Sequence, residues 1–147
     1  MILNGHLEYE HVQVLRGVVS DFAEPPAKGR PQVAFADVTR RRWADRLGEE
    51  FLSGECHAGR YEASIVMAAD PDGVREAERT ALEPVTIGLI EKMRAGVKSF
   101  REAGADAAYC GDPAQASAAE GRNLIDSLAT IVLDLARETW PDRFAAK

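Results

Sequence analysis

Several classes of protein are excluded by what the sequence has little of. It has two cysteines, Cys56 and Cys110, too few for a disulfide framework and without the C-x-x-C spacing of structural zinc sites. No apolar run approaches the roughly 20 residues that span a membrane. The apolar start at residues 1–3 is broken by Asn-Gly too soon for a signal peptide. We therefore expect a cytoplasmic protein with reduced thiols and no membrane partner.

Positive charge is also in short supply. The formal net charge is -6, which argues against nucleic acid as a partner, because phosphate binding needs a basic face. The cluster Arg40-Arg41-Arg42 is the exception, and we interpret it as a solvated surface. A length of 147 residues with 46% hydrophobic residues is typical of one ordinary globular domain, so we expect a single domain over residues 1–147.

Hydrophobic spacing in the first third predicts a βαβ unit. Residues 1–3 read as the end of a buried strand, and the helical spacing of apolar residues predicts an amphipathic helix over residues 7–22. Prolines predict a loop at residues 23–31. Residues 33–38 are apolar on both faces until Asp37, which is typical of a buried parallel strand. Because a domain rarely begins at the last residues of a strand, we expect that something precedes residue 1.

The rest of the chain reads as helices joined by turns. We expect a short helix that follows Thr39 and runs through Trp43 and Leu47, then a loop at 53–59 and a buried helix at 60–69. A turn at 70–73, a weaker helix at 74–82, a helix from 84 to 96 and mostly loop at 96–111 follow. Asp112-Pro113 predicts an N-cap and first turn. The stripe Leu124, Leu128, Ile131 and Leu135 predicts the longest helix, which ends near Trp140.

Two short polar stretches hold the candidate functional residues. His6 and Glu8 lie two apart, so in an extended segment both side chains can face one point and hold an ion. The alternative is a surface histidine beside a glutamate that is favoured at a helix start. From spacing alone, this alternative is slightly favoured.

The second stretch contains His57 and Glu62. A carboxylate on an otherwise apolar helix costs several kcal/mol unless it is paired or metal-bound. A hydrogen bond that the His57 imidazole donates to the Glu62 carboxylate would orient the ring as a general base needs. The alternative is a structural pair that caps the helix. Cys56 invites a thiolate interpretation, which we rank low because no orienting residue is placed for it. Glu55 reads as a supporting or a solvated residue.

Four motifs resemble those of the creatininase (creatinine amidohydrolase) family. Residues 4–10 (Asn-Gly-His-Leu-Glu-Tyr-Glu) resemble its Asn-Gly-His-x-Glu-Asn motif, and residues 57–64 (His-Ala-Gly-Arg-Tyr-Glu-Ala-Ser) its His-Ala/Gly-Gly-x-x-Glu-Thr-Ser motif. The segment 65–74 matches the helix and Pro turn that follow, and residues 111–121 resemble the Gly-x-Pro…Ala-Thr/Ser-Ala-Glu-x-Gly element. The resemblance spans nearly the whole chain.

The resemblance implies a three-layer α/β/α sandwich with a mostly parallel sheet, assembled into homo-oligomers. It implies a binuclear zinc or manganese centre, with His6 and Glu8 as ligands of different ions, His57 as the catalytic histidine and Glu62 as its supporting carboxylate. The implied reaction is attack of metal-activated water on a cyclic or linear amide of a small molecule. Creatinine, a formylamino-pyrimidine and a modified peptide all fit that chemistry.

The sequence departs from the family pattern in three ways. Cys56 stands where a glutamate precedes the histidine, and Ala63 replaces the usual threonine. The remaining ligands, in a Glu-x-His-Gly…Asp stretch, belong to an N-terminal half that the sequence does not contain, so we expect a fold truncated on that side. Two hypotheses follow. The first is an amidohydrolase whose missing ligands come from another chain or are lost by truncation, and the second is a non-catalytic remnant or assembly subunit.

Overall fold

The structure is a computed structural model that describes residues 1–22 and 31–145. The loop predicted at 23–31 therefore lies almost wholly outside the described residues. The chain divides into two compact units, one formed by Met1–Trp43 with Ala129–Lys147 and the other by Ala44–Leu128. Each unit is described by itself.

The first unit contains the predicted βαβ arrangement. Strand β1 (Ile2–Leu3) is followed by helix α1 (Tyr9–Asp21) and strand β2 (Phe35–Ala36). The two strands pair in parallel, with Ile2 opposite Phe35. The prediction of a parallel strand within 33–38 is confirmed, although only two residues of it form the ladder. Asp37 and Val38 are buried just beyond its end.

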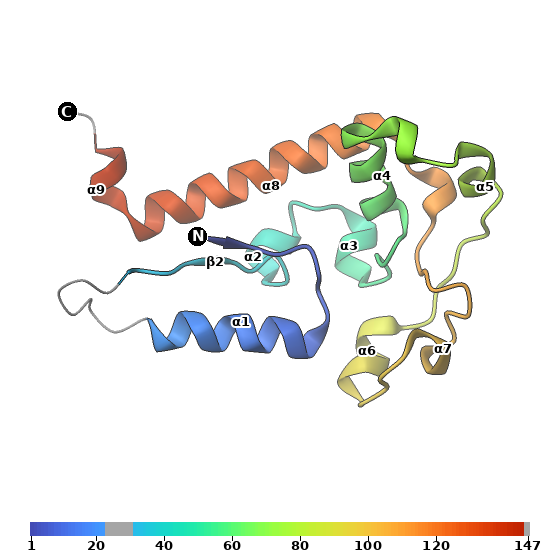
Figure 1. Cartoon of the computed structure of the whole chain (residues 1–147), viewed down its shortest axis with the longest axis horizontal. Helices are drawn as coiled ribbons and strands as arrows, with labels where there is room; N and C mark the ends of the chain where they lie inside the picture. Colours follow the sequence, from blue (N-terminus) through green and yellow to red (C-terminus); the bar gives the residue numbers. More distant parts are fainter. Residues whose placement is uncertain (23–30, 146–147) are drawn as a thin grey trace. The chain divides into compact units, whose positions relative to one another are not determined.

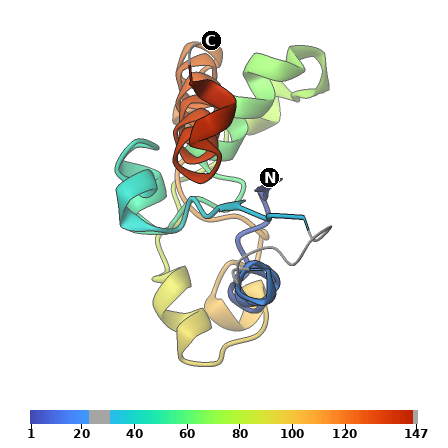
Figure 2. The ribbon, with the colours of Figure 1, turned by 90° about the vertical axis from the view of Figure 1, so that its left-hand side faces the viewer.

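Helices lie on both sides of this small sheet. In Figures 1 and 2, α1 lies on one side of the strands and the part of α8 from residue 129 onward lies on the other. The short helices α2 (Arg41–Ala44) and α9 (Pro141–Phe144) complete the unit. Its core is built from buried side chains of each layer, namely Val12, Ala36, Val38, Trp43 and Ile131.

The second unit is helical among its described residues. Its helices are α3 (Glu49–Ser53), α4 (Arg60–Ala69), α5 (Glu76–Thr80), α6 (Leu89–Arg94), α7 (Phe100–Ala103) and the first half of α8 (Ala118–Thr139), with single 3₁₀ turns η1 (Pro71–Gly73) and η2 (Pro113–Gln115). The predicted helix at 60–69 and the long C-terminal helix are confirmed. The helices predicted near Trp43, at 74–82 and at 84–96 exist but are shorter than expected, namely α2, α5 and α6. The turn predicted at 70–73 is η1.

Three details of the prediction are wrong. Helix α3 was not predicted. It lies just before the loop predicted at 53–59, and its sequence, which begins with two glutamates, has no apolar stripe that would indicate a helix. The region after Asp112 forms η2, and α8 begins only at Ala118. Helix α4 is not buried all round: Tyr61 and Ser64 are its buried residues, while the Val66 side chain is 47% exposed.

The structure is thus mostly helical with one two-stranded parallel sheet, in agreement with an α/β class. Strands this short satisfy few backbone groups, so helix packing supplies most of the core. None of the helices in the described part of the chain has the length and apolar character required to cross a membrane.

Candidate functional site

The early motif leaves β1 as a short extended segment held by local hydrogen bonds. The Asn4 side chain accepts a hydrogen bond from the His6 N–H at 3.2 Å and donates one to the His6 carbonyl. These bonds fix the His6 backbone and leave its imidazole exposed. Because β1 and β2 are parallel, His6 follows the same edge of the sheet as Asp37 does.

Glu8 has a structural task in this segment. It is the N-cap of α1, and its Oε2 accepts a hydrogen bond from the His11 N–H at 3.0 Å. A carboxylate here satisfies one of the unpaired amides of the first turn and complements the helix dipole. The helix-start interpretation of Glu8 is therefore confirmed. It leaves the second carboxylate oxygen for a ligand, so the two interpretations are compatible.

The later motif places His57 in a turn between α3 and α4. Its carbonyl accepts a hydrogen bond from the Cys110 N–H at 2.9 Å. Its ring stacks on Phe100, with 4.1 Å between ring centroids and 18° between planes. Backbone and ring are thus both held, which restricts the rotamers of a half-buried imidazole.

Glu62 binds the backbone of the same turn. Its Oε2 accepts a hydrogen bond from the Ala58 N–H at 2.6 Å, and Ala58 adopts a left-handed φ of 49° that residues with a side chain rarely adopt. In the described residues, no hydrogen bond joins Glu62 to the His57 imidazole, so that expectation is wrong. Glu62 instead stabilises the strained residue next to His57.

The two cysteines are poor nucleophiles. Burial first, and then the negative charge of Glu62, raises the pKa of the Cys56 thiol to about 12. Burial likewise raises the pKa of Cys110 to about 11. Both thiols are free and stay protonated near neutral pH. The low rank given to a Cys56 thiolate agrees with this environment.

Glu55 is not a solvated turn residue. Its side chain is buried, and Oε1 accepts hydrogen bonds from three successive backbone N–H groups at the start of α6, those of Ile87, Gly88 and Leu89. Its Oε2 is buried and has no partner among the described residues. The carboxylate ties the chain before His57 to a segment more than 30 residues away.

Glu50 is the residue that the sequence analysis missed. Its Oε1 accepts from the N–H groups of Arg60 (2.9 Å) and Asp112 (2.7 Å), and its Oε2 from that of Tyr61 (2.6 Å). It therefore caps the N-terminus of α4 from a different helix. The only available signal was a glutamate nine residues before Gly59, and such a distance has no helical or turn period. Asp112 itself makes no side-chain cap to η2, so its predicted capping role is wrong.

The two later motifs pack against each other. The Ser64 Oγ accepts a hydrogen bond from the Ser117 N–H at 3.0 Å, and Arg60 pairs with Glu120 at 2.6 Å. A Cβ on Gly121 would lie 1.8 Å from the Ser64 carbonyl oxygen, so glycine is required where α8 crosses α4. The small residues of these motifs therefore allow α4 and α8 to pack closely.

The four predicted site residues fall in different units, with His6 and Glu8 in the first and His57 and Glu62 in the second. Their convergence stays a prediction. Imidazole and carboxylate donors suit zinc or manganese, but within residues 1–22 and 31–145 no three His, Cys, Asp or Glu side chains form a group that could hold an ion. His6 and Glu8 are donors of the right type, and catalytic zinc sites generally use about three protein ligands.

A comparison with protein families identifies the relationship. The family model for creatininase, described as creatinine amidohydrolase, matches residues 1–136. The chain belongs to the creatininase family. This confirms the resemblance drawn from the four motifs. Searches of curated proteins and of solved structures gave no match to this member of the creatininase family.

Proposed function

We propose that this creatininase-family chain takes part in metal-dependent hydrolysis of a cyclic or linear amide C–N bond in a small molecule. The observation that carries the proposal is the family match over residues 1–136, which includes every motif that bears a proposed functional residue. The small sheet with helices on both sides supports a three-layer α/β/α sandwich as the proposed fold.

His57 is proposed as the proton carrier. Hydrolysis adds hydroxide to the carbonyl carbon and a proton to the departing nitrogen, and an imidazole can accept and return that proton near neutral pH. The contacts of His57 support this role, because its carbonyl and one ring face are engaged while it remains half-buried. Glu62 holds the adjacent Ala58 and so positions the turn.

His6 and Glu8 are proposed as ligands of zinc or manganese. When bound, such an ion lowers the pKa of water and polarises the amide carbonyl. The Glu-x-His-Gly…Asp ligands of the family pattern do not occur in this sequence. We therefore include in the proposal a complementing chain, or other copies in a homo-oligomer, as the source of further ligands.

The first test compares hydrolysis by the native protein and by His57→Ala, each supplied with zinc or manganese and with a complementing chain that carries the missing ligand motif. The assay uses creatinine, a formylamino-pyrimidine and linear amides. We expect His57→Ala to abolish turnover and to leave metal content unchanged. Asn123→Ala, an exposed residue of α8 in the same unit, is the control and should match the native protein. Loss of metal in His57→Ala would assign His57 to the metal site instead.

Metal analysis tests the ligand assignment. Catalytic zinc sites generally use about three protein ligands plus water, so the chain by itself should retain little zinc or manganese after gel filtration. With a complementing chain, metal should be retained and His6→Ala should remove it. Stoichiometric metal in the pure chain would contradict the proposed division of ligands.

Phe100 is proposed as a positioning residue for His57. Phe100→Leu removes the stacked ring and should reduce kcat with little change in KM, whereas Phe100→Tyr keeps the ring and should restore kcat. If Phe100 had only a structural role, Phe100→Leu would lower the stability of the protein without a selective decrease in kcat. Equal kcat for all three proteins would remove Phe100 from the mechanism.

The second candidate function is a non-catalytic assembly subunit. It is favoured by two motif residues, Ser64 and Gly121, whose contacts join α4 to α8 and serve packing. If no amide in the panel is hydrolysed by metal-loaded, folded protein with the complementing chain, the catalytic proposal fails. Stable association with that chain would then support the subunit role.

A further inference from the structure

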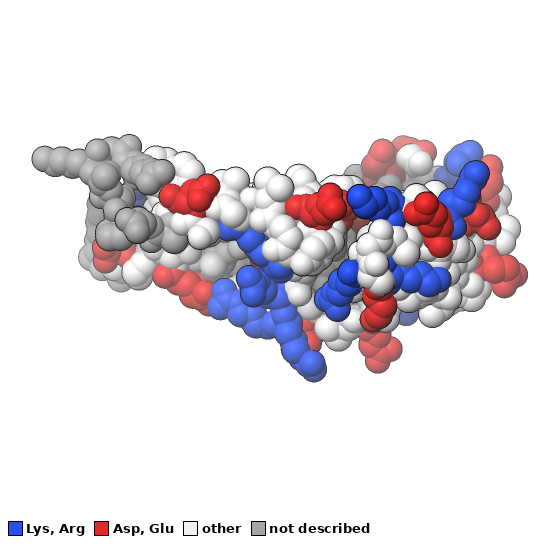
Figure 3. Space-filling model, turned by 90° about the horizontal axis from the view of Figure 1, so that it is seen from below, with Lys and Arg blue, Asp and Glu red and all other residues white. Residues whose placement is uncertain are grey.

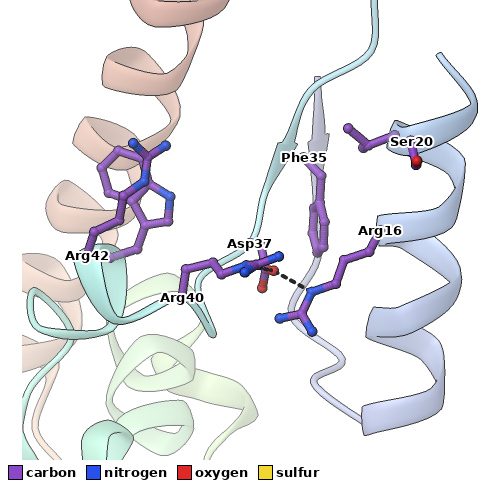
Figure 4. Close-up of a pocket in the computed structure, with 8 residues that line it drawn as sticks. Arg16, Ser20, Phe35, Asp37, Arg40 and Arg42 are labelled. Atoms are coloured by element: carbon purple, nitrogen blue, oxygen red, sulfur yellow. Dashed lines mark hydrogen bonds and ion pairs between the residues drawn. The ribbon is translucent and has the colours of Figure 1, made fainter. Parts of the chain in front are cut away.

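The first unit contains a pocket whose lining residues lie outside the four family motifs. It has a volume of about 550 Å³ and lies between α1, the end of β2 and α2. Figure 4 shows its lining, which comes from Arg16, Val19, Ser20, Phe35, Asp37, Arg40, Arg42 and Trp43. All of these residues belong to one compact unit, so the pocket is a property of that unit alone.

Two guanidinium groups are held in this pocket by one carboxylate. The Nε atoms of Arg16 and Arg40 lie 2.8 and 3.1 Å from the same oxygen of Asp37, and Arg16 also donates to the Thr39 hydroxyl at 3.0 Å. Figure 4 shows both side chains reaching Asp37 from different elements. A single arginine would neutralise Asp37, so the second leaves an excess of positive charge.

The guanidinium groups retain donors for a ligand. Among the described residues, the side chain of Arg40 donates through Nε alone, which leaves both of its Nη groups available. Arg16 uses Nε and one Nη and keeps the other. Because Asp37 fixes the two side chains in advance, a bound anion would not have to order them. Planar guanidinium forks match carboxylate and phosphate oxygens.

Aromatic side chains supply the other wall. Trp43 lines the pocket, and the Arg42 guanidinium lies 4.0 Å from its ring centroid. Phe35 presents a second ring, which lies near Arg16 in Figure 4. A flat unsaturated group can stack on such rings and guanidinium planes. Figure 3 shows Lys and Arg side chains gathered together on the face seen from below, although the chain as a whole is acidic.

We propose that this pocket binds a small molecule that carries a phosphate or carboxylate group beside a flat unsaturated ring. The oxyanion occupies the Nη groups of Arg16 and Arg40, and the ring lies against Phe35. The exposed side chains of Arg40 and Arg42 fit the solvated-surface interpretation. That interpretation does not account for the buried carboxylate of Asp37, which Arg16 and Arg40 share at the wall of the pocket. None of the lining residues is among the four residues proposed for hydrolysis, His6, Glu8, His57 and Glu62.

The test uses the full chain with Trp140→Phe, which leaves Trp43 as the single tryptophan reporter. Phenyl phosphate, benzoate and inorganic phosphate are titrated while Trp43 fluorescence is followed. We expect saturable binding of phenyl phosphate, weaker binding of inorganic phosphate, and weakening of both by added salt. Comparison of phenyl phosphate with benzoate shows which oxyanion the pocket prefers.

Matched variants locate the site. Arg40→Gln should weaken phenyl phosphate binding about tenfold, because a charge-assisted hydrogen bond is lost, and Arg40→Lys should weaken it less. Arg122→Gln removes an exposed arginine of α8 and should bind as the parent does. Arg40 is exposed, so its replacement should leave the circular dichroism spectrum unchanged. No saturation by about 10 mM of either ring-bearing anion, or equal weakening by Arg40→Gln and Arg122→Gln, would overturn the proposal.

Discussion

The early and later motif regions are held in place in opposite ways. In the later region, carboxylates and small residues join segments 10 to 62 residues apart, as Glu50, Glu55 and Ser64 show. In the early region, the side-chain hydrogen bonds of Asn4 and Glu8 span only two or three residues. Long-range bonds make one region part of the core, whereas local bonds leave the other as an exposed segment.

This difference shows that a family motif mixes two kinds of residue. Ser64 and Gly121 belong to motifs that imply a hydrolase, yet their contacts make them helix-packing residues. The imidazoles of His6 and His57 do not join helices in this way, and each contacts one other ring, that of His11 and of Phe100 respectively. The histidines are therefore the better candidates for chemistry. Four predictions test the comparison, from the largest expected effect to the smallest.

The largest effect is expected for Gly121→Ala. Its new Cβ would meet the backbone oxygen of Ser64, so α4 and α8 would have to separate, at a cost of about 3 kcal/mol in the free energy of unfolding. Gly5→Ala in the early motif is the control. A Cβ at Gly5 meets no described atom within 4 Å, and its effect should stay within about 0.5 kcal/mol. Urea denaturation measures both, and equal effects would erase the distinction between the regions.

Glu50→Ala should have the next largest effect. Three backbone N–H groups lose one shared charged acceptor, and we expect the free energy of unfolding to fall by about 2 kcal/mol in total. Glu49→Ala on the same helix removes an exposed glutamate and should change stability by less than about 0.5 kcal/mol. Urea midpoints give both values. A stable Glu50→Ala protein would show that Glu50 does not organise the later region.

Asp37→Asn should cost about 1 kcal/mol at neutral pH. Burial raises the pKa of Asp37, but hydrogen bonds from Thr39, Arg16 and Arg40 outweigh it and lower the pKa below its ordinary value. The stabilisation is therefore present above the unfolded pKa of about 4 and is lost as the pH falls through the folded value. Urea denaturation from pH 7 down to pH 3 should show the native and Asp37→Asn proteins converging in acid. A constant difference at every pH would contradict the ionised role.

The smallest effect is expected for Glu8→Ala. It removes one capping bond at the exposed start of α1, which should cost about 0.5 kcal/mol. Glu8→Asp keeps a capping carboxylate and should retain most of that stability. Thermal unfolding followed by circular dichroism is sufficient for the comparison. A loss as large as that of Glu50→Ala would mean that the early motif is also a core element.

Much of the local structure could be predicted because it depends on short-range periodicity. The apolar spacing of residues 7–22 and the stripe from Leu124 to Leu135 correctly indicated α1 and α8. The apolar run before Asp37 indicated β2. Helix α3 could not be found in this way. It is only five residues long, and its Phe51 ring packs on Tyr61 of another helix, with 4.8 Å between ring centroids. Such a short helix depends on tertiary contacts rather than on its own sequence pattern.

For the candidate site, the sequence identified the residues but not their contacts. His6, Glu8, His57 and Glu62 were recognised from motif spacing, and the family comparison supports the motifs. The partner of Glu62 could not be predicted, because spacing does not say which donor a carboxylate will meet. Phe100 was in a segment expected to be mostly loop, where nothing indicated a ring against His57.

By itself, the sequence determined the family, the amphipathic helices and the parallel strand, because these depend on residue types at fixed short spacings. Only the tertiary structure decided that Glu55 is buried, that Glu50 caps a distant helix, and that three arginines line a pocket beside Asp37. The physical reason is that a carboxylate or guanidinium takes its role from the groups that meet it in space, and those groups come from distant parts of the chain.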